Sequence, residues 1–122
     1  MAGENGGTLT THVLDTATGR PAAGLSIKLY RVGSSGAREK IADVTTNSDG
    51  RCDGPILGSD GFQIGLYELV FAAGAYFDGL DLDLPDPKFL DDVVIRFGMS
   101  EHTHYHVPLL ISPFGYSTYR GS

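Results

Sequence analysis

The stretch Leu25-Ser26-Ile27-Lys28-Leu29-Tyr30 has an aliphatic side chain at every second position. Successive side chains of a β-strand point to opposite faces of a sheet, so this alternation predicts a strand with one face on a core and the other in water. The same period of two recurs along the chain. It predicts further strands over residues 9–14, 41–46, 67–72, 93–97, 105–111 and 116–119.

Turn sequences rich in Gly, Pro, Asn and Ser separate these segments, and only residues 75–80 have a pattern that suits a helical turn. Seven or eight short strands with one helical turn predict an all-β fold, either an antiparallel sandwich or a barrel. Pro108 lacks the amide N–H that a ladder needs. We therefore expect strand 105–111 to lie at a sheet edge or to be bulged at this residue.

The length and composition are those of one globular domain. The chain has 122 residues, of which 41% are hydrophobic and 20% charged. Two independent halves would each be close to the size at which disulfides or metals are usually needed for stability. We predict a flexible N-terminal tail over residues 1–7 and a single domain over residues 8–122.

The charge balance and the cysteine content limit the partners and the compartment. Nine Lys and Arg against fifteen Asp and Glu give a net charge of -6, so no positive field attracts a phosphate backbone or an anionic membrane. We expect neither a nucleic-acid nor a membrane partner. Cys52 cannot form an intrachain disulfide, and the first residues lack the basic and apolar segments of an export signal. These features predict a cytoplasmic location.

Three of the four histidines lie close together, at His102, His104 and His106. They would share one face if the strand were continuous over all three. Such a row suits a metal site, a metal-free site in which neutral imidazole acts as a base, or a solvated strand end. The spacing leaves these interpretations open, because a zinc site also needs a further ligand at a defined place.

Two other residues have both a functional and a structural interpretation. His12 lies within strand 9–14 and shares its face with Thr10 and Leu14, and a lone strand histidine is usually a hydrogen-bonded structural residue. Arg51 follows the turn Asn47-Ser48-Asp49-Gly50. A loop of this kind either presents the guanidinium to a ligand or leaves it on the surface.

Several motifs together resemble the 5-hydroxyisourate hydrolase family, the transthyretin-related enzymes of urate breakdown. They are Thr11-His12-Val13-Leu14-Asp15, Asp49-Gly50-Arg51, His104-Tyr105-His106-Val107-Pro108-Leu109-Leu110 and the terminal Tyr116-Ser117-Thr118-Tyr119-Arg120-Gly121-Ser122. The resemblance extends from about Leu9 to Ser122. The terminal Tyr-Arg-Gly-Ser is its most specific element, because the transthyretin hormone carriers of the same fold lack it.

The resemblance implies a two-sheet antiparallel β-sandwich of the transthyretin type, with about eight strands and one short helix. It implies a homotetramer built as a dimer of dimers, with active sites in the channel where the dimers meet. The active-site positions of the family correspond to His12, Arg51, His106, Tyr119 and Ser122. The implied reaction, in purine catabolism, is hydrolysis of 5-hydroxyisourate to 2-oxo-4-hydroxy-4-carboxy-5-ureidoimidazoline without a metal or other cofactor.

For that reaction we expect His12 and His106 to activate water, one as the base and the other as its orienting or proton-returning partner. Arg51 would bind the anionic ring, Tyr119 would stack on the substrate or donate to it, and Ser122 would fix a histidine tautomer. Two alternatives remain. One is a small-molecule carrier without catalysis, and the other is a zinc-dependent cyclic amidohydrolase that uses His102, His104 and His106.

Overall fold

The computed structural model describes residues 6–122. Residues 1–5 of the expected N-terminal tail lie outside the described residues. Gly7 is buried against the Phe62 ring, which lies where a side chain on Gly7 would be.

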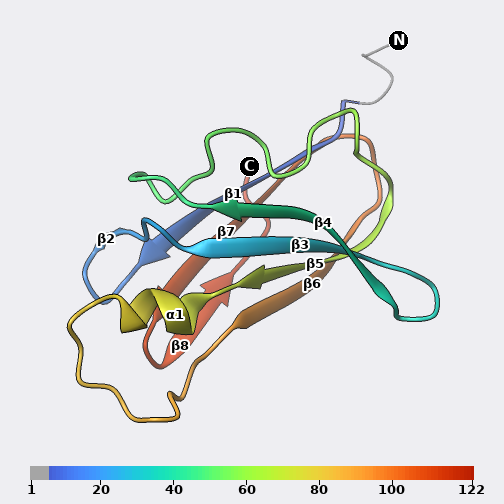
Figure 1. The fold of residues 1–122 in the computed structure, drawn as a ribbon. Coiled ribbons are helices and arrows are strands. Elements are labelled where there is room, and N and C mark those ends of the chain that lie inside the picture. The colour runs from blue at the N-terminus through green and yellow to red at the C-terminus, as the bar shows by residue number, and fades with distance from the viewer. Residues whose placement is uncertain (1–5) are drawn as a thin grey trace.

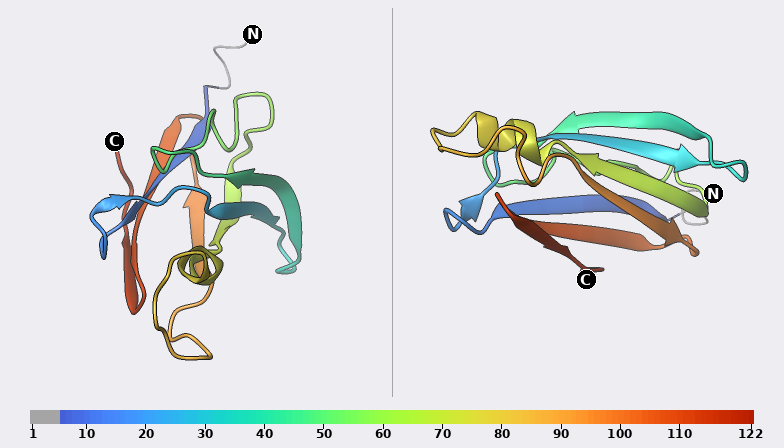
Figure 2. Two further views of the ribbon diagram at one scale, coloured as in Figure 1. Left: turned by 60° about the vertical axis from the view of Figure 1, so that its left-hand side comes forward. Right: turned by 90° about the horizontal axis from the view of Figure 1, so that it is seen from below.

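Eight strands form two four-stranded sheets, in the orders β2-β1-β7-β8 and β4-β3-β5-β6 (Figure 1). The sheets lie face to face as two layers, with the short helix α1 at one end (Figure 2). This arrangement confirms the predicted two-sheet sandwich with about eight strands and one short helix. The elements are β1 Thr8–Asp15, β2 Arg20–Pro21, β3 Ser26–Val32, β4 Arg38–Thr45, β5 Gly65–Phe71, α1 Ala73–Asp78, β6 Val93–Met99, β7 His104–Ser112 and β8 Gly115–Thr118.

One strand pair differs from the antiparallel arrangement that we expected. β1 and β7 pair in parallel, in register from Thr8 opposite His104 to Asp15 opposite Ile111. The chain between them forms the whole second sheet, so no local pattern in the sequence could reveal this pairing. The register sets the side chains of β1 directly beside the histidines of β7.

The core fills the space between the two sheets and follows the predicted alternation. In β1, Leu9, Thr11, Val13 and Asp15 are buried, whereas Thr8, Thr10, His12 and Leu14 on the opposite face are partly exposed. Burial of an aliphatic or Phe side chain contributes about 1.5–3 kcal/mol to folding. Burial of the inner side chains of β1 therefore determines that the face with Thr10 and His12 points outward. The fully buried side chains from both sheets include Val13, Leu109, Ile111, Ile27, Leu29, Tyr67, Leu69 and Phe71.

The prediction that Pro108 marks an edge or a bulge was wrong, because β7 lies between β1 and β8 and its register with β1 is unbroken at Pro108. The β7–β8 ladder begins only at Leu109, opposite Thr118, so Pro108 stands one residue outside it. β8 ends there, and the last four residues leave the strand. Gly121 then returns to form an isolated antiparallel bridge with His106.

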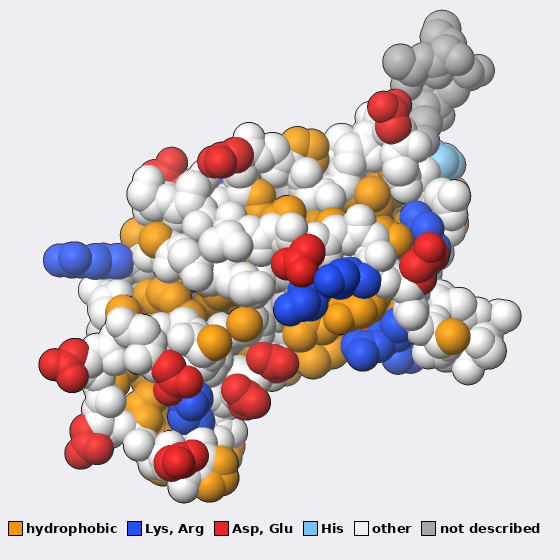
Figure 3. Space-filling model, viewed as in Figure 1, with side chains coloured by type: hydrophobic (Ala, Val, Ile, Leu, Met, Phe, Trp, Pro, Cys, Tyr) orange, Lys and Arg blue, Asp and Glu red, His pale blue; other side chains and the backbone are white. Residues whose placement is uncertain are grey.

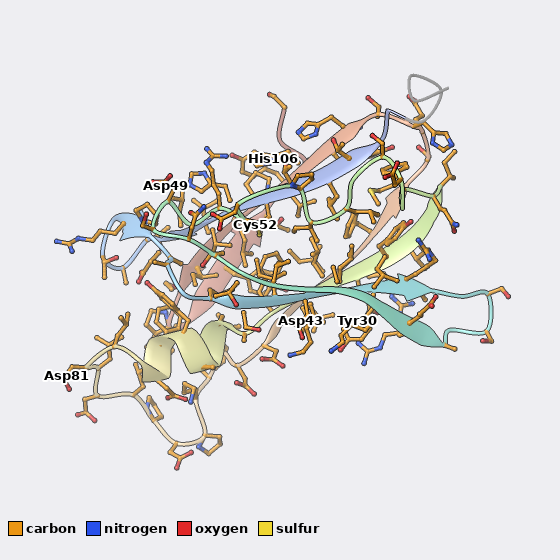
Figure 4. All side chains as sticks on the ribbon, turned by 45° about the horizontal axis from the view of Figure 1, so that its top comes forward. Tyr30, Asp43, Asp49, Cys52, Asp81 and His106 are labelled. Atoms are coloured by element: carbon orange, nitrogen blue, oxygen red, sulfur yellow. The ribbon has the colours of Figure 1, made fainter. Side chains whose placement is uncertain are left out.

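Acidic side chains gather at the end of the molecule that carries α1 and the loop after it (Figure 3). Lys88 in that loop donates to both oxygens of Asp78, at 2.9 and 3.1 Å. The acidic end is remote from His106 (Figure 4). Among residues 6–122, no helix has the length and apolar character needed to cross a membrane.

Candidate active site

A cavity of about 620 Å³ opens on the outer face of β1 and β7. Segments far apart in the sequence form its wall: β1, the loop after β4, β7 and the C-terminus. His106 and Cys52 lie near each other on this side of the molecule (Figure 4). The lining residues are Thr10, Thr11, Arg51, Cys52, Gly54, Pro55, His104, His106 and Ser122.

His106 lines this cavity and is partly buried. Its Nδ1 is 2.8 Å from Oγ1 of Thr10, its partner across the parallel pair. Burial lowers the pKa of His106, and the nearby charges of Arg51, His104 and His12 lower that pKa further. The imidazole is therefore neutral at pH 7, which is the form that acts as a base.

His12 stands on the same outward face, two residues along from Thr10. Its Nε2 is 2.9 Å from the backbone oxygen of Asp49. A carbonyl oxygen only accepts hydrogen bonds, so Nε2 must hold a proton and donate it. In neutral His12 the lone pair is then on Nδ1. His12 does not line the cavity. The positive charge of its protonated form nevertheless lowers the pKa of His106.

The turn before Arg51 is fixed by one side chain and one glycine. Oδ1 of Asn47 accepts from the amides of Asp49 and Arg51, at 2.9 and 3.2 Å. Gly50 has a φ of +74°, and its Cβ would collide with the carbonyl oxygen of Val13. Only glycine suits both conditions. The Val13 amide donates to the Gly50 carbonyl at 2.8 Å, so the turn is held against β1.

The guanidinium of Arg51 is exposed at the cavity wall. No acidic side chain among residues 6–122 forms an ion pair with it. Its charge and its fork of N–H donors are therefore available to an anionic, planar ligand.

The C-terminus closes one side of the site. The Gly121 amide donates to the His106 carbonyl at 2.8 Å, and a Cβ on Gly121 would lie 2.6 Å from Cδ2 of the His106 ring. This close approach brings Ser122 into the cavity wall.

Tyr119 is not brought to this cavity within one chain. It is 59% exposed and lines a second cavity of about 290 Å³, together with Phe97, Tyr105 and Arg120. Of the five predicted site residues, the structure thus brings together Arg51, His106 and Ser122, with His12 beside them and Tyr119 apart.

His102, His104 and His106 would share one face only in a strand that is continuous over all three, and β7 begins at His104. His102 precedes the strand and its ring packs on Phe62, with 5.6 Å between ring centroids. His104 and His106 stack at 6.3 Å. Within residues 6–122, His, Cys, Asp and Glu form no group of three or more that could hold a metal ion.

Two further residues, Thr10 and Cys52, lie at the site, and the sequence interpretation assigned a role there to neither. Thr10 contacts both His104 and His106, but only the parallel pairing of β1 with β7 reveals this. Cys52 lines the cavity, and burial, with the charge of Asp53, raises the pKa of its thiol. A thiol that stays protonated is a poor nucleophile, so we assign Cys52 no chemical role.

These sheet orders, with an imidazole- and guanidinium-lined cavity on one outer face, define a transthyretin-type sandwich that carries a candidate hydrolytic site. The model of the HIUase/Transthyretin family matches residues 9–121, and the chain belongs to this family.

Similar proteins include 5-hydroxyisourate hydrolases and a transthyretin. The 5-hydroxyisourate hydrolase of Mesorhizobium japonicum is 66% identical over 97% of this chain and 94% of its own length. The structure of Klebsiella pneumoniae 5-hydroxyisourate hydrolase has a TM-score of 0.78 at 35% identity, covering 95% of this chain and 94% of that one. Transthyretin from Sparus aurata has a TM-score of 0.84 at 26% identity, covering 93% and 96%.

Proposed function

We propose that this chain is a hydrolase that opens 5-hydroxyisourate in purine catabolism, with His12, Arg51, His106, Tyr119 and Ser122 as its site residues. The names of its relatives support the substrate. The observation that supports the chemistry is that one cavity is lined by both His106, a neutral imidazole, and Arg51, whose charge pairs with no acidic side chain of residues 6–122.

In the proposed reaction His106 removes a proton from a water molecule as that water attacks the ring carbonyl. Nδ1 of His106 is hydrogen-bonded to Thr10, which leaves Nε2 for this step. Arg51 binds the ring through its paired N–H donors and stabilises the developing oxyanion, an interaction whose loss typically costs about 10²–10³ in kcat. The carbon–nitrogen bond then breaks, the leaving nitrogen takes one proton, and the new carboxyl group ionises.

His12 is the second imidazole of the site. Because its Nε2 donates to the Asp49 carbonyl, its Nδ1 is the nitrogen that can accept a proton or orient the water. Ser122 lines the same cavity, where its hydroxyl or the terminal carboxylate can orient an imidazole.

We further propose that the active form is a homotetramer, a dimer of dimers, located in the cytoplasm. β6 and β8 are edge strands, and unpaired strand edges are templates for pairing with a second copy. Exposed aromatic side chains at Phe114, Tyr116 and Tyr119 also favour an interface. Tyr119 would then join the site through an adjoining subunit.

The test follows the ultraviolet absorbance of freshly generated 5-hydroxyisourate after addition of the purified protein. We expect its decay to accelerate in proportion to enzyme concentration. An unchanged decay, with the ligand bound, would instead support a transthyretin-like carrier. A parallel sample treated with a chelator tests the zinc alternative, because a zinc-dependent hydrolase would lose activity. We expect full activity in that sample.

A further inference from the structure

Four side chains on neighbouring strands form one continuous chain of hydrogen bonds. Oγ1 of Thr8 is 2.7 Å from Nδ1 of His104, and Nε2 of His104 is 3.3 Å from Oγ1 of Thr10. The same Thr10 oxygen is 2.8 Å from Nδ1 of His106. Hydroxyl and imidazole thus alternate from the exposed ring of His104 to the half-buried ring of His106 in the cavity.

The parallel register creates this arrangement. Thr8 stands opposite His104 and Thr10 opposite His106, so two threonines on one face of β1 interleave with two histidines on the same face of β7. The two imidazole rings are nearly parallel, with an interplanar angle of 16°. Both rings contact threonine hydroxyl oxygens. Each threonine is β-branched and therefore has a restricted χ1.

In two arrangements, all three hydrogen bonds run in one direction along the chain of hydrogen bonds. A threonine hydroxyl has one proton to donate, and a neutral imidazole donates at one nitrogen and accepts at the other. If Nδ1–H of His106 donates to Thr10, then Thr10 donates to Nε2 of His104, and Nδ1–H of His104 donates to Thr8. In that direction the lone pair of His106 is on Nε2. In the opposite direction Nε2 of His106 holds a proton and cannot act as a base.

We propose that Thr10 is a positioning residue that holds His106 as the tautomer with its lone pair on Nε2, and that Thr10, His104 and Thr8 form the path by which the surplus proton leaves the site. This proposal rests on the proposed hydrolase function. Thr8, Thr10 and His104 act through His106 and make no bond to the substrate.

The proton balance of the reaction explains why a path for a proton is needed. Hydrolysis forms one carbon–oxygen bond and breaks one carbon–nitrogen bond, and water supplies two protons. One proton goes to the leaving nitrogen. For a ring that binds in its neutral form, the other is released, because the new carboxyl group ionises at pH 7 and a ureido nitrogen is not basic. This proton must leave while the ring occupies the cavity, and His104, which lies between Thr8 and Thr10 in the chain of hydrogen bonds, is exposed.

The surrounding charges favour transfer away from His106. The groups that act on His106 are Arg51 from the loop after β4, His12 from β1 and His104 from its own strand. Arg51 is a permanent cation, so a protonated His106 is disfavoured beside it. Transfer through Thr10 to the exposed His104 moves the positive charge away from the half-buried ring.

The first experiment measures the His106 tautomer by ¹⁵N NMR of the imidazole rings and compares Thr10→Val with Thr10→Ser. Valine keeps the branched shape without the hydroxyl, and serine keeps the hydroxyl. We expect the wild type and Thr10→Ser to show Nδ1–H, and Thr10→Val to lose this preference. We also expect kcat to fall at least about tenfold in Thr10→Val with little change in KM, and to recover in Thr10→Ser. An unchanged tautomer and kcat in Thr10→Val would overturn the proposal.

The second experiment tests the proton path with His104→Ala, using His102→Ala as the matched control because His102 lies outside the chain of hydrogen bonds and packs on Phe62. We expect kcat of His104→Ala to be reduced and to rise with the concentration of imidazole buffer, which replaces the missing proton carrier. The His102→Ala and wild-type rates should not depend on buffer concentration. A buffer-independent, wild-type kcat for His104→Ala would overturn the proton path.

The two proposals fail in different ways. If the wild-type protein leaves 5-hydroxyisourate unchanged, the proposed function fails, whereas the NMR spectra still report whether Thr10 sets the His106 tautomer. If hydrolysis is normal and Thr10→Val alters neither tautomer nor rate, only the role of Thr10 fails.

Discussion

His12 and Arg51 are backbone partners in an isolated antiparallel bridge, although they lie 39 positions apart in the sequence. The bridge holds the start of the loop after β4 against β1. It therefore sets the guanidinium of Arg51 and the imidazole of His12 on adjoining backbone, next to the cavity that His106 lines.

Gly50→Ala should damage both stability and activity, because alanine would be strained at the positive φ and its Cβ would collide with the Val13 carbonyl. The control is Gly24→Ala, at a φ of +75° with open space around it. We expect the control to lose about 1–2 kcal/mol of unfolding free energy and to keep its kcat. Gly50→Ala should lose more stability and at least about tenfold in kcat/KM, since the Arg51 turn moves. Thermal unfolding and the absorbance assay measure both effects, and equal behaviour of the two variants would refute this interpretation of the turn.

Arg51→Ala should reduce kcat/KM by about 10²–10³ without lowering the melting temperature. Its side chain is exposed and pairs with no acidic group of the described part of the chain, so its loss leaves no buried group without a partner. Arg51→Lys should recover only part of the activity, because an ammonium lacks the planar fork of donors. Arg20→Ala, at an exposed position on β2, is the control and should retain wild-type kinetics.

Activity should persist below the ordinary histidine pKa of 6.5. Burial and the charge of Arg51 lower the pKa of His106, and neutral His106 is the active form, so the acid limb of kcat/KM should lie below pH 6.5. The unfolded chain binds this proton more strongly than the folded one, so the unfolding free energy should also fall as the pH drops below 6.5. NMR titration of Arg51→Gln should show the His106 pKa rising toward 6.5, and an unchanged pKa would exclude Arg51 as one of its causes.

Glu68→Gln should destabilise the second sheet. The Glu68 carboxylate is buried on β5 and accepts from Arg96 Nε at 2.7 Å and Arg38 Nη1 at 3.0 Å. We expect a loss of about 1.5–3 kcal/mol in unfolding free energy. Hydrogen bonding to Arg96 and Arg38 holds the Glu68 pKa below its usual 4.5, so the difference from wild type should shrink as the pH falls below that value.

The matched control for Glu68 is Glu39→Gln. Glu39 is 73% exposed and lies 3.9 Å from Arg31, so its ion pair is worth little. Denaturant unfolding of the two variants compares the loss of unfolding free energy at a buried carboxylate with the loss at an exposed one. Equal losses would show that the arginine contacts of Glu68 add no stability.

The strands were predictable because their signal is local. Alternation in residues 25–30 or 9–14 depends only on neighbouring positions, and a buried face enforces it. A helical turn was predicted over residues 75–80, and α1 spans Ala73–Asp78, so Gly74 lies inside the helix and Gly79 follows its end. The parallel pairing of β1 with β7 was not predictable from the same pattern. Side chains alternate between the two faces of a strand in the same way whether its partner is parallel or antiparallel.

The site was predictable only in part, and for the same reason. His106 and Arg51 could be named from motifs, but their common cavity depends on the β1–β7 register and on the turn at Gly50. His102 was wrongly grouped with His104 because strand starts are uncertain by a residue or two. The contacts of Thr10 with His104 and His106 could not be predicted, since they join residues 94 and 96 positions apart. The roles of all five predicted site residues, His12, Arg51, His106, Tyr119 and Ser122, stay predictions.

The most direct test of the account compares kcat/KM for His106→Ala, Arg51→Ala and the double variant in the 5-hydroxyisourate decay assay, with circular dichroism to verify folding. Residues that act as a unit have strongly non-additive effects. We predict that each single variant is folded and loses at least about a hundredfold, and that the double variant is little worse than the poorer single one. Near-wild-type turnover by either folded single variant would contradict the claim that one imidazole and one guanidinium share this active site.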